Sequence, residues 1–324
     1  MNLYIDKLNL ISLIDSRENK LYTDVLKLLK KQLDIFFNFS KEELKTDEKL
    51  MHWFMTFSDG VGEETINSFG NSFPDRPLKS NSHNDFDAKE TSSIYLMDDE
   101  KSHVFKDSGS VLTGGVGEEI EIITRVFLRH DDYKFEKKFR IGGDEFGKWT
   151  DLNKFSLPMT EIIIVDPFIL SNKNTDTDTM DINLIEFLKV LAIESNVKIN
   201  LILVTHPDKM DWDYATLKTK VNHALKSVTG KKTNITLIRT KTEHDRSILT
   251  NYCRIYSGDT FNFWNSSGKK ISKGREIAYS SLADIENEKM AEGFIADIQK
   301  TIIFLNKNNP DFIEGDKESR FLVF

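Results

Sequence analysis

The sequence predicts an α/β protein. Apolar runs of strand length alternate with amphipathic segments of helix length over residues 161–305, 39% of the residues are hydrophobic and 30% are charged, and 324 residues suffice for two ordinary domains. Such alternation is typical of a sheet with parallel neighbours and helices on its faces. We expect a smaller α+β domain over residues 1–145 and an α/β domain over residues 146–324.

The N-terminal domain is expected to combine strands, helices and loops. An apolar strand-like run comes first, and two segments with leucines and aromatics at helical spacing follow it. A stretch rich in Asn, Ser, Asp, Pro and Gly then predicts a long surface loop. The expected elements are strands 3–14, 92–97, 120–128 and 133–141, helices 21–37 and 41–57, the loop 67–89 and a glycine-rich connection 109–119.

The C-terminal domain shows the clearer pattern. Its apolar runs are short and bounded by polar residues, and the segments between them carry apolar residues at helical spacing. The expected strands are 161–168, 198–205, 234–239 and one or two within 244–256, and the expected helices are 182–194, 214–228 and 282–305.

Composition narrows the environment and the chemistry. No run of about eighteen uninterrupted apolar residues occurs, and the first residues lack the apolar core of a signal peptide, so we expect a cytoplasmic protein. The single cysteine, Cys253, excludes an intramolecular disulfide and a cysteine-rich metal site. The acidic stretch 171–181 lacks the glycine and the terminal glutamate of an EF-hand loop. We expect no metal ion and no cofactor.

Positive charge is concentrated in one part of the chain. The net charge is −8, yet the fifty residues from Lys226 to Arg275 contain eleven Lys or Arg and three acids, which leaves −16 for the remainder. Such a run is usually a solvated surface, but this one also contains the motif described next. It therefore predicts an anionic partner.

His244 and Arg246 stand two positions apart on a strand-like segment. Strand side chains repeat every two residues, so both are expected on one face, where they could grip a phosphate group. Asn251 follows Arg246 after four residues, and Gly258 follows Asn251 after six, with Asn262 shortly beyond.

This spacing resembles the motif of the phospholipase D superfamily, in which His-x-Lys is followed by an Asp and by a Gly-Ser-x-Asn type turn. The C-terminal half resembles, more narrowly, the phospholipase D-like C-terminal domain of MIT-domain proteins. Five segments carry this likeness in order and spacing: Thr160–Ile169, Asn183–Leu188, Lys198–Thr205, His244–Arg246, and Gly258 with Phe261–Phe263. The resemblance covers roughly residues 146–305 and implies a mixed sheet flanked by helices.

That domain is considered a non-catalytic, phospholipid-binding version of the fold in proteins that act with ESCRT-III. Residues 1–145 show no MIT three-helix bundle, so the ESCRT partnership is not expected here. The catalytic superfamily, by resemblance, needs two His-x-Lys motifs. This chain has one, because none of its other histidines has a cation two residues later. Catalysis would thus require a homodimer that pairs His244 with its copy.

The substitutions within the motif favour binding over catalysis. Arg246 in place of Lys keeps the charge and offers a planar, bidentate fork for phosphate. Asn251 in place of Asp weakens support for the histidine, if it occupies the orienting position. Asp259 replaces the small serine and adds negative charge beside the expected phosphate site.

Three hypotheses follow. The leading one is a domain that binds a phosphate-bearing polyanion, either nucleic acid or anionic lipid, while the N-terminal domain offers a surface to an unidentified protein partner. The alternative is a homodimeric phosphodiesterase or nuclease with His244 as nucleophile. The third is an interaction protein in which the motif only ties strands together. The catalytic positions are His244, Arg246 and Asn251, and the phosphate-binding candidates are Arg254, Gly258, Asn262, Lys269, Lys270, Lys273 and Arg275.

Overall fold

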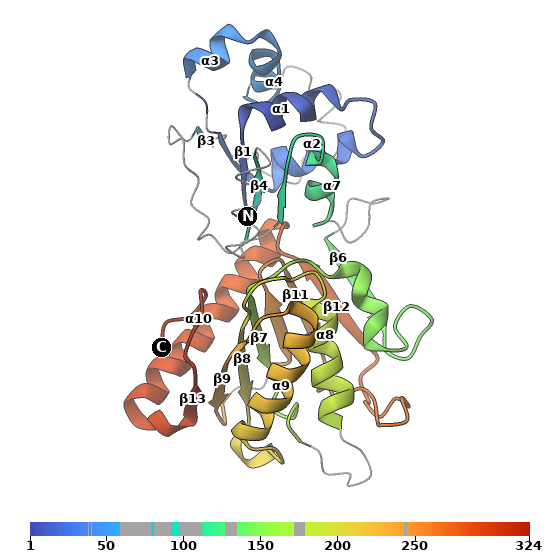
Figure 1. The fold of residues 1–324 in the computed structure, drawn as a ribbon, viewed down its shortest axis with the longest axis vertical. Helices are drawn as coiled ribbons and strands as arrows, with labels where there is room; N and C mark the ends of the chain where they lie inside the picture. Colours follow the sequence, from blue (N-terminus) through green and yellow to red (C-terminus); the bar gives the residue numbers. More distant parts are fainter. Residues whose placement is uncertain are drawn as a thin grey trace. The chain divides into compact units, whose positions relative to one another are not determined.

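The computed structural model describes residues 1–37, 39, 41–58, 79–80, 92–97, 112–126, 135–171, 179–242 and 245–324. They form two compact units, each with its own sheet (Figure 1). The first unit comprises Met1–Phe135 and Leu282–Glu288, and the second comprises Glu136–Ser281 and Lys289–Phe324. Both sheets are accompanied by helices, which confirms the prediction of an α/β chain.

The first unit is built on a parallel sheet with the strand order β3-β2-β1-β4-β5. Its elements are β1 (Asn2–Ile5), α1 (Lys7–Asp15), α2 (Tyr22–Lys31), β2 (Asp34–Phe37), α3 (Lys41–Thr46), α4 (Glu48–Ser58), β3 (Lys79–Ser80), β4 (Ser93–Leu96), β5 (Leu112–Gly114) and α7 (Glu119–Thr124). Parallel neighbours require crossover connections, which helices commonly supply. The expected α+β architecture of this unit is therefore corrected to α/β.

Three expected elements of the first unit change type or length. The run 3–14 splits at Asp6, which ends β1 and caps α1 by accepting a backbone N–H of its first turn at 2.8 Å. The expected helix 21–37 ends early because its last four residues pair with β1 as β2. The expected strand 120–128 begins within α7, where buried isoleucines recur at helical spacing. Pairing and packing with distant segments outweigh the local pattern.

The second unit is built on an eight-stranded sheet with the order β13-β9-β8-β7-β10-β11-β12-β6. Its elements are β6 (Glu136–Arg140), η2 (Trp149–Phe155), β7 (Glu161–Val165), η3 (Asp181–Ile185), α8 (Glu186–Ala192), β8 (Asn200–Thr205), η4 (Pro207–Lys209), α9 (Tyr214–Thr229), β9 (Asn234–Arg239), β10 (Ser247–Thr250), β11 (Cys253–Ser257), β12 (Glu276–Ser281), α10 (Ile285–Asn308), η5 (Pro310–Phe312) and β13 (Ile313–Gly315). Strands β7, β8 and β9 are parallel, and all other pairs are antiparallel. The sheet is therefore mixed.

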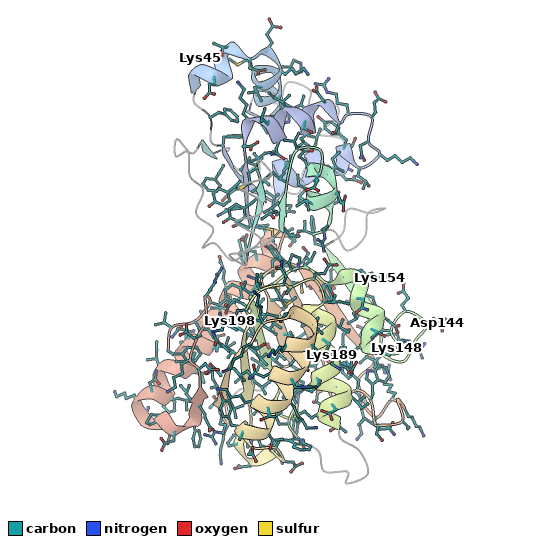
Figure 2. All side chains as sticks on the ribbon, viewed as in Figure 1. Lys45, Asp144, Lys148, Lys154, Lys189 and Lys198 are labelled. Carbon is teal, nitrogen blue, oxygen red and sulfur yellow. The ribbon has the colours of Figure 1, made fainter. Side chains whose placement is uncertain are left out.

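The two ends of the strands matter for the site. We call the side of the sheet at which β7, β8 and β9 end the carboxyl edge, and the side at which they begin the amino edge; neither term refers to an outermost strand. Because β10 is antiparallel to β7, β10 begins at the carboxyl edge. Lys198, labelled in Figure 2, precedes β8 and marks the amino edge. Helices α8 and α9 cover one face of the sheet, and α10 covers the other (Figure 1).

Candidate functional site

Arg246 comes immediately before β10, at the carboxyl edge. Ser247 pairs with Val165, so one further step of the antiparallel register places Arg246 beside Asp166, the residue after β7. The side chain of Arg246 is half-buried. His244, the centre of the predicted motif, lies outside the described residues. The described part of the motif is thus an arginine next to an acid.

Asp166 is a fully buried residue whose carboxylate binds two separate turns of the chain. Its Oδ1 accepts the backbone N–H of Phe168 at 2.8 Å, and its Oδ2 accepts the Thr260 hydroxyl and the Phe261 N–H, both at 2.7 Å. Burial raises the pKa of Asp166 to about 6, although these hydrogen bonds and the positive charge of Arg246 act to lower it. Asp166 therefore joins the end of β7 to the turn after β11.

No motif in the sequence assigns a role to Asp166. A signal was present, because Asp166 is the first polar residue after a buried strand of a sheet with parallel neighbours. In open α/β sheets, ligands bind outside the carboxyl ends of such strands. This rule singles out the edge, but the three hydrogen bonds to the carboxylate join residues too distant in sequence to be foreseen.

Asp259 fixes the path of the segment that precedes β12. Its Oδ2 accepts hydrogen bonds from the Ser272 hydroxyl at 2.8 Å and from the backbone N–H groups of Lys273 and Gly274 at 3.0 and 3.1 Å. Burial raises the pKa of Asp259, but the hydrogen bonds to its carboxylate outweigh burial and hold the pKa below its ordinary value. Asp259 was predicted to add negative charge beside a phosphate, but its carboxylate instead accepts hydrogen bonds from the neighbouring loop.

The turn after β11 contains two residues expected to contact phosphate. A side chain added at Gly258 would meet nothing within 4 Å, so the backbone there borders open space. Asn262 instead turns inward: it is 8% exposed, and its Nδ2 donates to the carbonyl of Phe168 at 2.6 Å. Its Nδ2 also donates to the carbonyl of Ser171 at 3.5 Å, so the amide that a phosphate would need is directed at main-chain carbonyls. Asn262 therefore holds the turn against the end of β7.

A buried asparagine secures the other end of this turn. Asn183, in the π-helical turn η3, accepts the backbone N–H of Trp264 at 2.9 Å and donates to its carbonyl at 2.8 Å. π-Helical turns are rare and frequent at functional sites. Together with Asp166 and Asn262, this asparagine fixes residues 260–264 in one conformation.

The segment 265–275, which we call the basic loop, presents the densest positive charge at the carboxyl edge. Its tip is closed by the side-chain carbonyl of Asn265, which accepts the N–H groups of Ser267 and Lys269 at 3.1 and 2.8 Å. In Figure 1 the loop is the orange segment that projects at the lower right. Its cations are Lys269, Lys273 and Arg275, which are exposed, and Lys270, which is half-buried. None of the four makes an ion pair with any residue in the described ranges.

Arg254, a predicted phosphate ligand, lies on the face covered by α10. Its Nη2 contacts a carboxylate oxygen of Asp245 at 3.2 Å and the hydroxyl of Ser247 at 2.8 Å. Its guanidinium lies over the rings of Phe294, in α10, and Tyr256. Side chains of successive strand residues point to opposite faces of a sheet. Ser247 contacts Arg254 on the α10 face, so the preceding residue, Arg246, is expected on the other face, beside Asp166 in the register. The structure does not bring Arg254 and Arg246 together.

Asn251 lies at the amino edge, at the end of β10 away from Arg246. It is fully buried, and its Oδ1 accepts the backbone N–H groups of Thr160 and Glu161 at 2.8 and 3.0 Å. Its Nδ2 donates to the Thr160 hydroxyl at 3.1 Å. Asn251 therefore anchors the start of β7 and has no place beside Arg246.

The basic stretch 226–275 is divided by the fold. Lys231 and Lys232 precede β9 and so belong to the amino edge. Lys241 pairs with Asp208, and Arg239 pairs with Glu314. Besides these two paired cations, the carboxyl edge carries Arg246, Lys269, Lys270, Lys273 and Arg275. The footprint for an anion is smaller than the charge count of the sequence indicates.

Within the described ranges, no group of three or more His, Cys, Asp or Glu side chains is placed to hold a metal ion. Among the helices formed by these residues, none has the length and apolar character to cross a bilayer. The chain matches no protein-family model, and no curated protein is similar to it in sequence.

Proposed function

We propose that the second unit binds a phosphate-bearing polyanion, nucleic acid or anionic lipid, at the carboxyl edge through Arg246 and the basic loop. One observation carries this proposal. The four cations of the basic loop make no ion pair in the described part of the chain, while Asp259 holds the backbone of that loop in place. Cations on a fixed backbone attract an anion, and binding then does not cost the conformational entropy of ordering the loop.

Arg246 supplies the contact nearest the sheet. A guanidinium presents several N–H donors in a plane, which matches two oxygens of one phosphate. The turn after β11 adds open backbone at Gly258 close by. The resemblance of the sequence to phospholipase D-like domains supports the same edge, because Arg246 and Gly258 belong to the segments that carry it. His244, the homodimer and a protein partner for the first unit stay predictions.

The test compares two double charge reversals in the full chain. Lys269→Glu with Lys270→Glu changes the basic loop, and Lys231→Glu with Lys232→Glu makes the same charge change at the amino edge. We expect the first pair to weaken binding of a rhodamine-labelled oligothymidylate, or of vesicles containing anionic lipid, by about tenfold or more at low salt. The second pair should change it by less than about twofold, since screening limits distant charges.

The outcomes separate the hypotheses. Equal effects of the two variants would show general charge attraction and would contradict a site at the carboxyl edge. A loss confined to the oligonucleotide, or confined to the vesicles, identifies the source of the phosphate. Cleavage of the oligonucleotide in the presence of EDTA, abolished by His244→Ala, would instead support the phosphodiesterase hypothesis.

A further inference from the structure

The parallel sheet of the first unit has a topological switch point between β1 and β4. In the order β3-β2-β1-β4-β5, the chain extends the sheet from β1 toward β3 and then returns to the other side of β1 with β4. Backbone hydrogen bonds connect the strand ends, from the Asp6 N–H to the Leu96 carbonyl at 2.9 Å and from the Met97 N–H to the Gly114 carbonyl at 3.1 Å. In open α/β sheets, ligands bind at such a point, outside the carboxyl ends of the strands.

Two acids lie at these strand ends with little access to solvent. Asp6 follows β1 and is 6% exposed, and Glu119, the first residue of α7 after β5, is 1% exposed. Neither makes an ion pair with a described residue, and the lysine next to Asp6, Lys7, pairs with Asp47 at 3.8 Å. Buried charges in proteins are usually paired with an opposite charge or coordinate a metal ion. These two acids have no such pair in the described part of the chain.

A buried amide oxygen without a hydrogen bond lies beside the first acid. Asn9 is 0% exposed, and its Nδ2 and its backbone N–H both donate to Asp6 Oδ1, at 2.9 and 2.8 Å. Its Oδ1 accepts no hydrogen bond. Since the two polar atoms of an amide share one carbon, this oxygen lies close to the Asp6 carboxylate. Exchanging the two atoms would bring oxygen against oxygen, so the hydrogen bond fixes their assignment. A buried polar atom without a partner is rare, and a bound ion is one of its explanations.

A hydrogen bond joins the second acid to the same face of α1. Ser12 stands three residues after Asn9, so the two side chains are neighbours on the helix surface. The Ser12 hydroxyl donates to Glu119 Oε2 at 3.1 Å, and the Gly117 N–H donates to Glu119 Oε1 at 2.9 Å. Each carboxylate oxygen can still accept a second contact. Burial raises the pKa of Glu119, and the negative charge of Asp6 raises it further, although its hydrogen bonds act to lower it.

The N–H groups at these strand ends are already bound by carboxylates, which excludes an anionic ligand. At the start of α1, Asp6 accepts a backbone N–H. In the glycine-rich turn after β5, the N–H of Gly115 donates to Glu118 Oε2 and that of Gly117 donates to Glu119 Oε1, both at 2.9 Å. A phosphate would need these donors and would meet negative charge. The oxygens that remain are acceptors, so the ligand must be a cation or a hydrogen-bond donor.

We propose that Asp6, Asn9 and Glu119 bind a hard divalent cation, Mg²⁺ or its analogue Mn²⁺, at the strand ends of the first unit. Carboxylate and carbonyl oxygens suit these ions. Mg²⁺ is commonly held by one or two carboxylates and keeps several of its waters. The set combines two acids with an amide, so it differs from the groups of three or more His, Cys, Asp or Glu, none of which occurs within the described ranges. This site is independent of the polyanion site proposed for the second unit.

The experiment titrates the full chain with Mn²⁺ and follows the electron paramagnetic resonance signal of the free ion. We expect the wild type to bind about one Mn²⁺ that Mg²⁺ displaces. Asp6→Asn keeps an oxygen that can cap α1, and Glu119→Gln keeps an oxygen for the Gly117 N–H, but each removes one negative charge. Each variant should weaken Mn²⁺ binding by about tenfold or more, because affinity follows the charge of the ligands.

Two matched controls remove the same charge from acids outside the set. Asp15→Asn changes the far end of α1, and Glu118→Gln changes the exposed acid next to Glu119. Each should alter Mn²⁺ affinity by less than about twofold, since exposed charges are screened. Asn9→Asp tests the orphan oxygen directly. A third carboxylate there should lower the unfolding temperature without metal and tighten Mn²⁺ binding by about tenfold.

Several results would overturn the proposal. These are the absence of saturable Mn²⁺ binding by the wild type, a failure of Mg²⁺ to displace Mn²⁺, and equal weakening by the controls and by Asp6→Asn or Glu119→Gln. Circular dichroism checks that each variant is folded. Asn9→Asp decides if the other two variants do not fold, because an unchanged or weaker Mn²⁺ affinity in that variant contradicts the site. A folded Asp6→Asn with wild-type Mn²⁺ affinity would show that Asp6 only caps α1.

Discussion

The two edges of the eight-stranded sheet carry polar residues of opposite kinds. At the amino edge, Asn251 binds the start of β7, and the buried Glu161 accepts hydrogen bonds from the side chains of Asn200 and Ser319. At the carboxyl edge, Asp166 and Asp259 bind turns, but the cations of the basic loop, of which Lys269, Lys273 and Arg275 are exposed, make no ion pair with a described residue. The buried polar groups at the first edge satisfy one another. Exposed cations without an ion pair to a described residue occur at both edges, but the amino edge has Lys231 and Lys232, whereas four cations are gathered in the basic loop at the carboxyl edge.

This difference separates structural from binding roles better than residue type does. A buried polar group must be hydrogen-bonded, so a fully satisfied cluster is expected to stabilise the fold and nothing more. Exposed cations on a fixed backbone that make no ion pair with a described residue have no comparable structural reason. Asn251 falls on the structural side of this division, and the cations of the basic loop fall on the other.

The largest expected effect is therefore structural and lies at the amino edge. Asn251→Ala leaves the N–H groups of Thr160 and Glu161 buried without an acceptor, and each such loss costs about 1–3 kcal/mol. We expect the free energy of unfolding to fall by about 4 kcal/mol in urea denaturation. Binding of oligothymidylate by the folded fraction should not change.

Asn251→Asp is the matched control, since it keeps an acceptor for both N–H groups. It should destabilise less than Asn251→Ala. If Asn251 stood where the phospholipase D motif has its Asp, this change would create or increase phosphodiesterase activity. A gain in activity would therefore contradict the placement of Asn251 at the amino edge.

The next effect concerns the pH dependence of stability at the carboxyl edge. The pKa of Asp166 is about 6 in the folded chain against an ordinary 3.8, so the folded state binds this proton more tightly than the unfolded state. The resulting stability is fully present below 3.8 and is lost as the pH rises through about 6. Two pKa values this far apart correspond to about 3 kcal/mol.

The measurement is the free energy of unfolding of the wild-type chain minus that of Asp166→Asn, at about pH 4 and about pH 7. We expect this difference to be larger at the lower pH. Asp259→Asn gives the opposite sign, because the pKa of Asp259 is lowered: its contribution is present above 3.8 and lost as the pH falls. The same trend for both acids would show that the assignment of Asp166 is wrong.

The sequence predicts the parallel strands at the centre of the second sheet well and the strands farther from the centre poorly. Strands β7, β8 and β9 and helix α9 occur where hydrophobic periodicity places them, because the strands are buried along their length and the helix buries one face. Strands β12 and β13 were not expected, since they are short segments defined by their pairing. The parallel sheet of the first unit was also missed, because β2 and β5 depend on partners far away in sequence.

The candidate site could be predicted only in part, for a related reason. Arg246, Gly258 and the cations of the basic loop fall at one edge, as their shared motif and charge run indicate. Asn251 and Arg254 do not join them, because their partners lie elsewhere on the sheet and on α10, and Asn262 lies at this edge but turns its amide inward to the loop after β7. The roles of Asp166 and Asp259 depend on hydrogen bonds across 94 and 13 residues, which no local pattern reveals.

The smallest expected effect distinguishes the two faces of the sheet at β10. Arg254→Met removes a partly buried ion pair with Asp245 and the contact over Phe294, which should cost about 1–2 kcal/mol of stability. Its effect on binding of oligothymidylate should stay below about twofold, whereas Arg246→Met should weaken binding by about tenfold with a smaller loss of stability. Urea denaturation and fluorescence anisotropy on the two variants give both quantities. If Arg254→Met weakened binding as much as Arg246→Met, the anion would contact both faces, and the division of cations between the faces would not describe the site.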